Sequence, residues 1–358
     1  MNPRPKKRLQ RAVFRACERI GERKGHYRLK RFWTYAAVLI LAAGCLIAGL
    51  CMGEETDLIP PSPEPPVPEG KERPTPAPTE VPEQTLIDHI HFPDELPDFH
   101  FEKNASLLEI WIPNIRDADE AVLTYQGQVY MIDCGDNRAA NRGVLLLRQL
   151  GIDRVDILFI SHPHHDHTDG LRTTFQQARI LEIQTCFPDD STESGINMAA
   201  AAEELGIRLL RYGDRQVFTM GDGAVRLQFL QNADPTLDIN NRSAQTMVRY
   251  GERSIFFMAD MEKNGQISML GHVAPEELKC DIVKYPHHGK SAMYEAFFNA
   301  LQPRLAVVTS VTGRGDTGQT YLTWKHVPSV FTSVKGKFTH LATDGQYWLC
   351  EYVDVKSE

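Results

Sequence analysis

Cysteine is scarce in this sequence, and its spacing excludes one common kind of metal site. The 358 residues contain seven cysteines, no two of which are spaced as CxxC, so a cysteine-type structural zinc site is not indicated. Four of them lie far apart in apolar, strand-like surroundings: Cys134, Cys186, Cys280 and Cys350. These four could form two disulfides in three possible pairings, or they could be buried free thiols.

The sequence also lacks a recognisable side-chain nucleophile. No Ser-His-Asp or Cys-His arrangement stands out, and we find no internal repeat. The protein is therefore expected to supply little nucleophilic chemistry of its own. With 42% hydrophobic and 24% charged residues, the composition is that of a globular protein carrying an added segment.

Positive charge is scarce beyond the first 33 residues. Residues 1–33 hold twelve Lys or Arg against two Glu, a local charge of +10, whereas the remainder holds 27 basic and 45 acidic residues, a net charge of −18. Tight non-specific binding of a polyanion depends on Lys and Arg that neutralise phosphates. The acidic remainder therefore does not favour nucleic acid as a partner, and the basic start is more simply a topology signal.

Residues 34–53 contain no charged residue, and their length suits a helix that crosses a bilayer. Basic residues precede this run and Glu54, Glu55 and Asp57 follow it, so the positive-inside rule places the basic tail 1–33 in the cytoplasm. We therefore predict a single-pass protein of the cell membrane, anchored in the lipid bilayer by residues 34–53, with its catalytic domain extracellular. A cleaved signal peptide is the alternative, but it would normally have a shorter basic region and a small-residue cleavage site.

Residues 54–100 form a proline-rich linker. Ten prolines lie between residues 54 and 85 among Glu, Thr and Ser, a composition that favours extended polyproline segments and cannot build a core. We interpret the linker as a semi-rigid stalk that holds the following domain, residues 101–358, away from the membrane.

In this last domain, short apolar strands alternate with helical stretches. The segments expected as strands are 107–113, 121–125, 129–134, 155–161, 180–186, 225–230, 244–250, 254–258, 281–285 and 305–309, with further strand within 338–353. Helices are expected at 142–150, 195–205, 262–270 and 293–301. Strand-rich halves with outer helices predict an α/β fold in the form of a four-layer αββα sandwich.

The strongest signal in the chain is a histidine-rich segment at the end of the apolar strand 155–161. SHPHHDHTDG, residues 161–170, spaces His162, His164, Asp166 and His167 as HxHxDH. Imidazole and carboxylate ligands suit zinc and related divalent ions, and these positions can direct the first two residues to one ion and the last two to another. His165 fills a spacer position and is expected to be an exposed neighbour.

This segment resembles the signature of metallo-β-lactamase-fold hydrolases, and two later segments fit that family in the same order. FFMAD, residues 256–260, resembles the strand ending in the Asp that bridges both metals, here Asp260. KYPHHG, residues 284–289, resembles the late His motif, in which His287 or His288 is the ligand.

A narrower resemblance comes from KYPHHGK taken with three further segments: IDCGDN at 132–137, INN at 239–241 and TDG at 343–345. Together they are similar to the extracytoplasmic hydrolase domain of ComEC-type DNA-uptake proteins and to related choline-phosphate esterases, over about residues 105–353. The resemblance implies two divalent metal ions, zinc or manganese, with Asp166 and Asp260 as the catalytic carboxylates.

The sequence departs from the family pattern at two points. No His occurs between His167 and His272, so the extra His ligand that many members place before the bridging Asp is missing. Asn240, Asn241 or a water would then complete the shell of that metal. The early VGQGDA-like turn of the DNA-uptake relatives appears here as IRDADEA at residues 115–121.

Four polar residues are further candidates near the metals. Asp133 ends the strand 129–134 and is expected to orient a ligating His, although it could equally be a strand-end turn residue. Asn240, Asn241 and Ser243 could hydrogen-bond the oxyanions of a substrate, or they could be ordinary loop residues.

These features together predict hydrolysis, because a water bridging two ions that share Asp260 would have a pKa lowered toward neutrality. The resemblance favours an extracellular phosphodiesterase acting on a phosphoester: DNA, a wall polymer or a choline-phosphate ester. The acidic charge favours a small ester. An acyl hydrolase of a thioester, lactone or lactam would use the same chemistry. A catalytically weak surface-binding protein is the third interpretation, supported only by the missing His.

Overall fold

The computed structural model describes residues 89–92 and 99–356. The predicted basic tail 1–33, the predicted membrane helix 34–53 and most of the predicted linker lie outside the described residues. Within the described ranges, no helix has the length and apolar character that crossing a bilayer requires.

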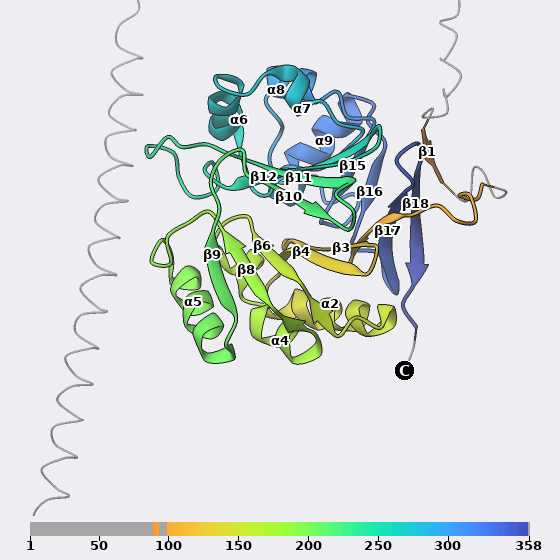
Figure 1. Ribbon diagram of the computed structural model, residues 1–358. Coiled ribbons are helices and arrows are strands. Elements are labelled where there is room, and N and C mark those ends of the chain that lie inside the picture. Colours follow the sequence, from red (N-terminus) through yellow and green to blue (C-terminus); the bar gives the residue numbers. More distant parts are fainter. Residues whose placement is uncertain (1–88, 93–98, 357–358) are drawn as a thin grey trace, which may run out of the picture. The chain divides into compact units, whose positions relative to one another are not determined.

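Two β-sheets face each other in the described part of the chain (Figure 1). The larger sheet has the order β1-β18-β17-β2-β3-β4-β6-β8-β9, and the second has the order β10-β11-β12-β13-β14-β15-β16. The strands of the larger sheet are β1 (Ile90–His91), β2 (Leu108–Ile112), β3 (Glu120–Tyr125), β4 (Gln128–Cys134), β6 (Ile157–Ile160), β8 (Glu182–Thr185), β9 (Arg208–Arg211), β17 (Lys337–Thr343) and β18 (Trp348–Asp354). Those of the second are β10 (Val217–Met220), β11 (Val225–Gln231), β12 (Ala244–Tyr250), β13 (Arg253–Phe257), β14 (Ile282–Lys284), β15 (Leu305–Val308) and β16 (Ser329–Phe331). A small separate pair joins β5 (Arg154–Val155) to β7 (Arg179–Ile180).

Helices cover the outer face of each sheet (Figure 1). The larger sheet carries α2 (Asn137–Leu150), α4 (Leu171–Gln177) and α5 (Glu193–Leu205), and the second carries α6 (Lys263–Leu270), α7 (Pro275–Leu278), α8 (Glu295–Leu301) and α9 (Thr317–Trp324). Two short turns of helix, α3 (His165–Thr168) and η1 (Pro286–Gly289), lie in loops between them. The predicted αββα layering of a mixed α/β fold is confirmed for this domain.

The main hydrophobic core fills the space between the two sheets. Ile110 and Phe159 from the larger sheet pack into the same cluster as Leu227 and Ile255 from the second. These residues occupy inward-facing positions of their strands. Some of the strands alternate apolar and polar residues and others are apolar throughout, which is the pattern expected for sheets buried on one or both faces. The core is what makes the two sheets a rigid support for the loops at their ends.

Helix α2 shows how local sequence signals set an element's bounds. The Asp136 side chain accepts hydrogen bonds from the backbone N–H groups of Arg138 and Ala139, which caps the helix start. Gly151 ends the helix in the left-handed region at φ 68°. The predicted stop at this glycine is therefore confirmed, whereas the helix begins at Asn137, five residues before the predicted start.

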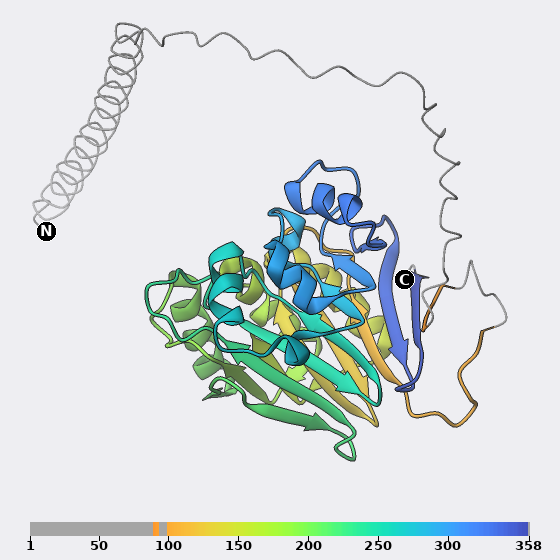
Figure 2. The ribbon, with the colours of Figure 1, turned by 90° about the horizontal axis from the view of Figure 1, so that it is seen from above.

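Three further features refine the expectations from sequence. Strand β1 lies within residues 54–100 and pairs in parallel with β18, so the folded domain begins before residue 101. The stretch 338–353 is a hairpin of β17 and β18, and the dark blue strands of this hairpin lie along one side of the domain in Figure 2. The four cysteines of the domain are free thiols, which decides between the two alternatives for them.

The strand directions bring the candidate residues to one edge. Strands β4, β6 and β8 are parallel neighbours, as are β13, β14, β15 and β16. The carboxyl ends of parallel strands meet at the same edge of a sheet, where loops are both accessible and rigidly held. The HxHxDH segment follows β6, Asp260 follows β13, and the late His pair follows β14.

Candidate metal centre

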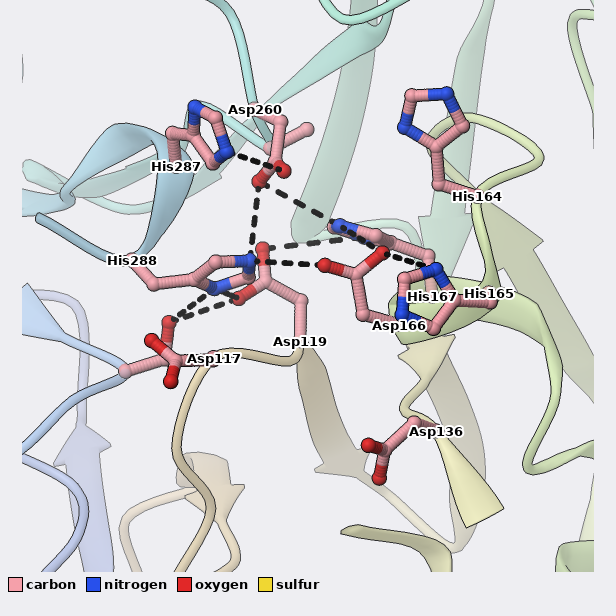
Figure 3. A network of polar contacts seen from close by, with 12 residues as sticks. Asp117, Asp119, Asp136, His164, His165, Asp166, His167, Asp260, His287 and His288 are labelled. Atoms are coloured by element: carbon pink, nitrogen blue, oxygen red, sulfur yellow. Dashed lines mark hydrogen bonds and ion pairs between the residues drawn. The ribbon is translucent and has the colours of Figure 1, made fainter. Parts of the chain in front are cut away.

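Four side chains from three loops meet at this edge (Figure 3). His167 Nε2 lies 3.4 Å from Asp260 Oδ1. His288 Nε2 lies 3.5 Å from the same oxygen and 3.4 Å from Asp166 Oδ2. One ligand atom from each of Asp166, His167, Asp260 and His288 therefore lies within 4.8 Å of the others, so the fold brings together residues that are up to 122 positions apart in the sequence.

The donor atoms of this cluster are suited to a divalent ion. His167 Nε2, Asp260 Oδ1 and His288 Nε2 are buried and have no hydrogen-bond partner among the described residues. A buried polar atom without a hydrogen bond costs about 1–3 kcal/mol, so three of them around one point favour a further bonding group there. Two imidazoles and two carboxylates are a ligand set that zinc and manganese accept.

His162 and His164 form a pair beside this cluster. His162 Nε2 lies 3.1 Å from His164 Nδ1, and the ring of His162 lies 4.1 Å from that of His167 between centroids. His162 is fully buried and His164 is partly exposed. These two imidazoles are the candidates for a second ion next to Asp260.

Asp133 orients His167, as the sequence predicted. Its Oδ2 lies 2.8 Å from His167 Nδ1 and accepts a hydrogen bond from the Ser161 hydroxyl at 2.7 Å, while its Oδ1 accepts one from the Ser161 backbone N–H. With the proton held on Nδ1, the lone pair of Nε2 faces the cluster. The alternative of a simple turn residue does not account for these bonds.

Three residues that the sequence analysis did not single out hold His288 in the same way. His288 Nδ1 lies 3.1 Å from Asp119 Oδ1 and 2.9 Å from Thr309 Oγ1, and the Thr309 hydroxyl donates to Asp119. The buried Lys284 ammonium pairs with the other oxygen of Asp119. Asp119 lies in the IRDADEA segment and Lys284 opens the KYPHHG segment, but the sequence assigns neither residue a role at the site.

The structure separates the roles of the two adjacent late histidines. His288 is fully buried within the four-residue cluster, whereas the His287 side chain is 20% exposed and lies outside it. His287 Nδ1 is bonded to Glu262 Oε1 at 2.7 Å, and its Nε2 lies 3.7 Å from Asp260 Oδ2. His288 therefore has the ligand geometry, and His287 faces Asp260 from the rim of the site.

The backbone around the centre is held in a conformation that side chains rarely adopt. Asp133, Ala259, His287 and His288 all have positive φ, between 46° and 56°. Such residues cost of order 1–3 kcal/mol each unless the surroundings enforce them, and they concentrate at functional sites. Gly170 is required for a different reason: a Cβ there would lie 1.9 Å from the Cys134 carbonyl oxygen.

The predicted substrate-binding residues Asn241 and Ser243 form hydrogen bonds within the fold. Asn241 Oδ1 accepts hydrogen bonds from the backbone N–H groups of Glu262 and Gly265, at the start of α6, and its Nδ2 donates to Asp238. Ser243 is fully buried, and its hydroxyl accepts a bond from Gln245. These contacts lie within the fold, so the assignment of the two residues to substrate stays a prediction that the geometry does not favour.

Two other candidates lie where the sequence suggested. Asn240 is partly exposed, and its Oδ1 has no partner among the described residues, so it stays a candidate for substrate contact. His165 has a side chain that is 69% exposed, as expected for a spacer.

Charge within the centre is balanced between its carboxylates and imidazoles. Burial alone would lower the pKa of His167, but the charges of Asp133 and Asp260 outweigh it and raise that pKa well above its usual range. In His288 the carboxylates of Asp260 and Asp119 likewise overcome burial and raise the pKa to about 10. Burial would raise the pKa of Asp260, but the two imidazoles hold it well below its usual range.

The other histidine pair is neutral. Burial lowers the pKa of His162 well below its usual range, with the nearby charge of His167 adding to the effect, and it lowers the pKa of His164 as well. A neutral imidazole is the form that binds a metal. His162 and His164 are therefore ready to bind an ion at neutral pH, whereas an ion at the four-residue cluster must displace protons.

Comparison with known proteins bears on the centre directly. Residues 121–179 match the family model described as the metallo-beta-lactamase superfamily. This match covers 59 of the 358 residues and agrees with the predicted fold. The matched residues include Asp133 and the whole HxHxDH segment, while Asp260 and His288 lie outside them and are tied to the segment by the geometry above. The predictions of this fold and of a metal-dependent hydrolase are confirmed.

Solved structures with similar chains include the metallo-beta-lactamase fold protein YhfI from Bacillus subtilis, at 12% identity over 63% of this chain and 95% of that one, with a TM-score of 0.43. A variant of the CmlA beta-hydroxylase is 14% identical over 68% of this chain and 54% of its own, with a TM-score of 0.42. The Rm3 metallo-beta-lactamase is 14% identical over 50% and 79%, with a TM-score of 0.36. A search of curated protein sequences gave no match.

Proposed function

We propose that this protein is a membrane-anchored phosphodiesterase that works outside the cell with two divalent metal ions, zinc or manganese. The single observation that carries the metal-dependent part is the convergence of three unpartnered buried atoms: His167 Nε2, Asp260 Oδ1 and His288 Nε2. The preference for a phosphoester is supported by the resemblance of KYPHHGK and its companion segments to ComEC-type hydrolase domains. The anchor is supported by the uncharged run 34–53 after a basic tail.

The proposed ligand sets follow the two groups of side chains. Asp166, His167, Asp260 and His288 would hold one ion, and His162 and His164 would hold the other, with Asp260 shared between them. When bound, such ions supply the acidification of a water to a nucleophile and the neutralisation of negative charge on a phosphoryl group.

The residues around these ligands have defined tasks in this proposal. Asp133 keeps a proton on His167 Nδ1, and Asp119 with Thr309 does the same for His288, so both rings present Nε2 to the centre. Lys284 offsets the buried charge of Asp119, which keeps that carboxylate an acceptor rather than a proton donor.

His287 lies at the rim of the centre. It is bonded to Glu262, and its Nε2 lies 3.7 Å from Asp260 Oδ2, so it is the side chain that we expect nearest to a bound ester. The acidic character of the rest of the chain favours a small or locally bound phosphoester over a long nucleic acid.

The test of the activity uses the full-length chain in an uncharged detergent. Hydrolysis of bis-p-nitrophenyl phosphate, a thioester and nitrocefin is measured with and without a chelator. We expect turnover of the phosphodiester only, its loss with chelator and its return with zinc or manganese. His164→Ala should lose at least 100-fold in rate, whereas the matched His165→Ala should keep it.

Two results would contradict the proposal. An equal loss of hydrolysis rate in His164→Ala and His165→Ala would show that His164 has no role as a metal ligand that His165 lacks. Turnover of the thioester or of nitrocefin in place of the phosphodiester would assign an acyl hydrolase. The outward orientation is tested separately with an alkaline phosphatase fused after residue 358, which is active only outside the cytoplasm.

A further inference from the structure

A cavity lies at the opposite end of strand β3 from the metal centre. It has a volume of about 450 Å³, within the range of small-molecule sites. Strand β3 starts at Glu120, next to Asp119 of the metal centre, and ends at Tyr125, which lines the cavity. At about 3.3 Å per residue the two ends of this strand are roughly 17 Å apart. The cavity is therefore a separate site.

Aromatic rings make up much of its wall. Phe99, Phe101, Tyr125, Tyr250 and Tyr347 line it. Phe99 meets Phe101 edge to face at 5.2 Å and Tyr347 at 5.9 Å, and Tyr125 meets Tyr250 edge to face at 5.2 Å. In an edge-to-face pair one ring keeps both of its faces free of its partner, and a ring face attracts a cation.

The charged groups on the wall are of one sign. Glu102, Asp222 and Asp344 line the cavity, and its described lining contains no Lys or Arg. None of the three carboxylates forms an ion pair with any described residue. Asp344 Oδ1 accepts backbone N–H bonds from Gln346 and Tyr347, and these bonds fix the carboxylate without cancelling its charge.

The remaining polar groups on the described part of the cavity wall add no permanent positive charge. Asp222 accepts hydrogen bonds from the Ala224 backbone and the Gln126 side chain, and the Tyr250 hydroxyl donates to the Ser106 carbonyl. His100, which is exposed, is the one titratable base among the described lining residues. The His91 ring covers one side of Phe99, at 4.1 Å between ring centroids, so the rings of Tyr125, Tyr250 and Tyr347 are the ones we expect to meet a ligand. Carboxylates beside aromatic rings, with no Lys or Arg in the described lining, attract a positively charged ligand and repel an anionic one.

We propose that this cavity binds an organic cation, specifically an ammonium group carrying methyl or methylene carbons. The ring faces contact those carbons and attract the charge, and the carboxylates supply the counter-charge. Binding at this cavity does not depend on hydrolysis at the metal centre. If no cation binds here, the proposed phosphodiesterase activity is not affected.

The test is a calorimetric titration of the full-length chain with tetramethylammonium chloride. tert-Butanol, which has a similar shape and no charge, and sodium chloride at the same ionic strength are the matched probes. We expect saturable binding of tetramethylammonium alone, with the same dissociation constant after chelation of metals, because the two sites lie at opposite ends of β3.

Variants connect the binding to the wall. Tyr347→Ala should weaken tetramethylammonium binding about fivefold or more, the loss expected for one cation–ring contact. Tyr352→Ala is the control, because Tyr352 lies in β18, five residues after Tyr347, has nearly equal exposure, 41% against 39%, and lies outside the cavity. Glu102→Gln should also weaken binding, and Glu276→Gln, another exposed glutamate, should not.

Three outcomes would overturn the proposal. These are the absence of saturable binding, equal binding of tert-butanol, and equal effects of Tyr347→Ala and Tyr352→Ala. Thermal unfolding of each variant, followed by circular dichroism, establishes that a loss of binding occurs in a folded protein.

Discussion

Replacing Asp133 by Asn should weaken metal binding while leaving the domain folded. The carboxylate accepts hydrogen bonds from the Ser161 backbone at one oxygen and from His167 Nδ1 at the other. Asn can adopt the positive φ of 56° found at this position with little strain. The substitution therefore changes the hydrogen-bonding pattern and removes one negative charge beside His167, with little change in shape.

The consequence can be worked out for each orientation of the new amide. If its oxygen stays toward Ser161 N, its NH₂ group faces His167 Nδ1, which must then accept a bond. The ring proton moves to Nε2, the atom that faces Asp260, and a protonated Nε2 cannot bind a metal. If the amide turns over, two N–H groups meet at Ser161, which costs about 1–3 kcal/mol.

Either orientation penalises the metal-bound state. Loss of a partner that orients a metal-ligating His typically costs 10- to 100-fold in metal affinity, or about 1.4–2.7 kcal/mol. We expect a fall of this size in zinc affinity, measured by competition with a fluorescent chelator. The melting temperature of the metal-free protein should change by less than about 4 °C, because the amide also relieves the desolvation of a buried charge.

Asp136→Asn is the matched control. Asp136 is a carboxylate three residues away that caps α2 and does not contact His167, and Asn is an equally good helix cap. Its zinc affinity should equal that of the unaltered protein. An Asp133→Asn variant that binds zinc within twofold of Asp136→Asn would refute the assigned role of Asp133.

Three further predictions follow from the buried charges. Carboxylates raise the pKa of His288 to about 10, so zinc must displace a proton from this ring at pH 6–8. In a competition with a chelator, zinc affinity should therefore rise about tenfold per pH unit for each proton displaced. An affinity that does not change with pH would contradict this. Burial raises the pKa of Glu120 from 4.5 to about 8, so the free energy of unfolding falls as pH rises through that range. The melting temperature of Glu120→Gln should therefore lie a few degrees above that of the unaltered protein at pH 9, and the two should be equal at pH 4. Lys284→Met removes the buried ammonium that pairs with one oxygen of Asp119 and should cost about 3–5 kcal/mol in chemical denaturation. Lys290→Met breaks no buried ion pair and should cost less than about 1 kcal/mol.

The ligands could be predicted from sequence because their signals are local or ordered along the chain. HxHxDH follows an apolar strand, and a downstream Asp and a His pair follow two others, so strand-end placement alone brings them to one edge. The sequence also predicted Asp133 as the orienting carboxylate. It could not decide between His287 and His288, because that choice depends on which ring is held by a distant carboxylate.

The missed residues depend on contacts that have no local signal. Asp119 meets Lys284 across 165 residues and Thr309 across 190, and such pairs follow from sheet register rather than from any motif. Asn241 bonds to the start of α6 and Ser243 to Gln245. The sequence could not predict these contacts, because a polar loop residue has the same appearance whether it faces a ligand or bonds within the fold.

The missed elements were mostly short. Strands β9, β10 and β16 lie at or next to sheet edges and have three or four residues each, too few for a clear period-2 pattern. Helix α7 has four residues, and α4 begins directly after the metal-binding segment. Their positions are set by packing against the sheets and not by strong caps of their own.

The central claim is that two groups of side chains sharing Asp260 bind two metal ions. Anomalous X-ray diffraction from crystals grown with zinc tests it most directly. We predict two peaks for each chain. One should lie about 2.0–2.2 Å from Asp166, His167 and His288, and the other at the same distance from His162 and His164, with Asp260 next to both. A centre without a peak at His167 and His288, in crystals that contain zinc elsewhere, would contradict the account.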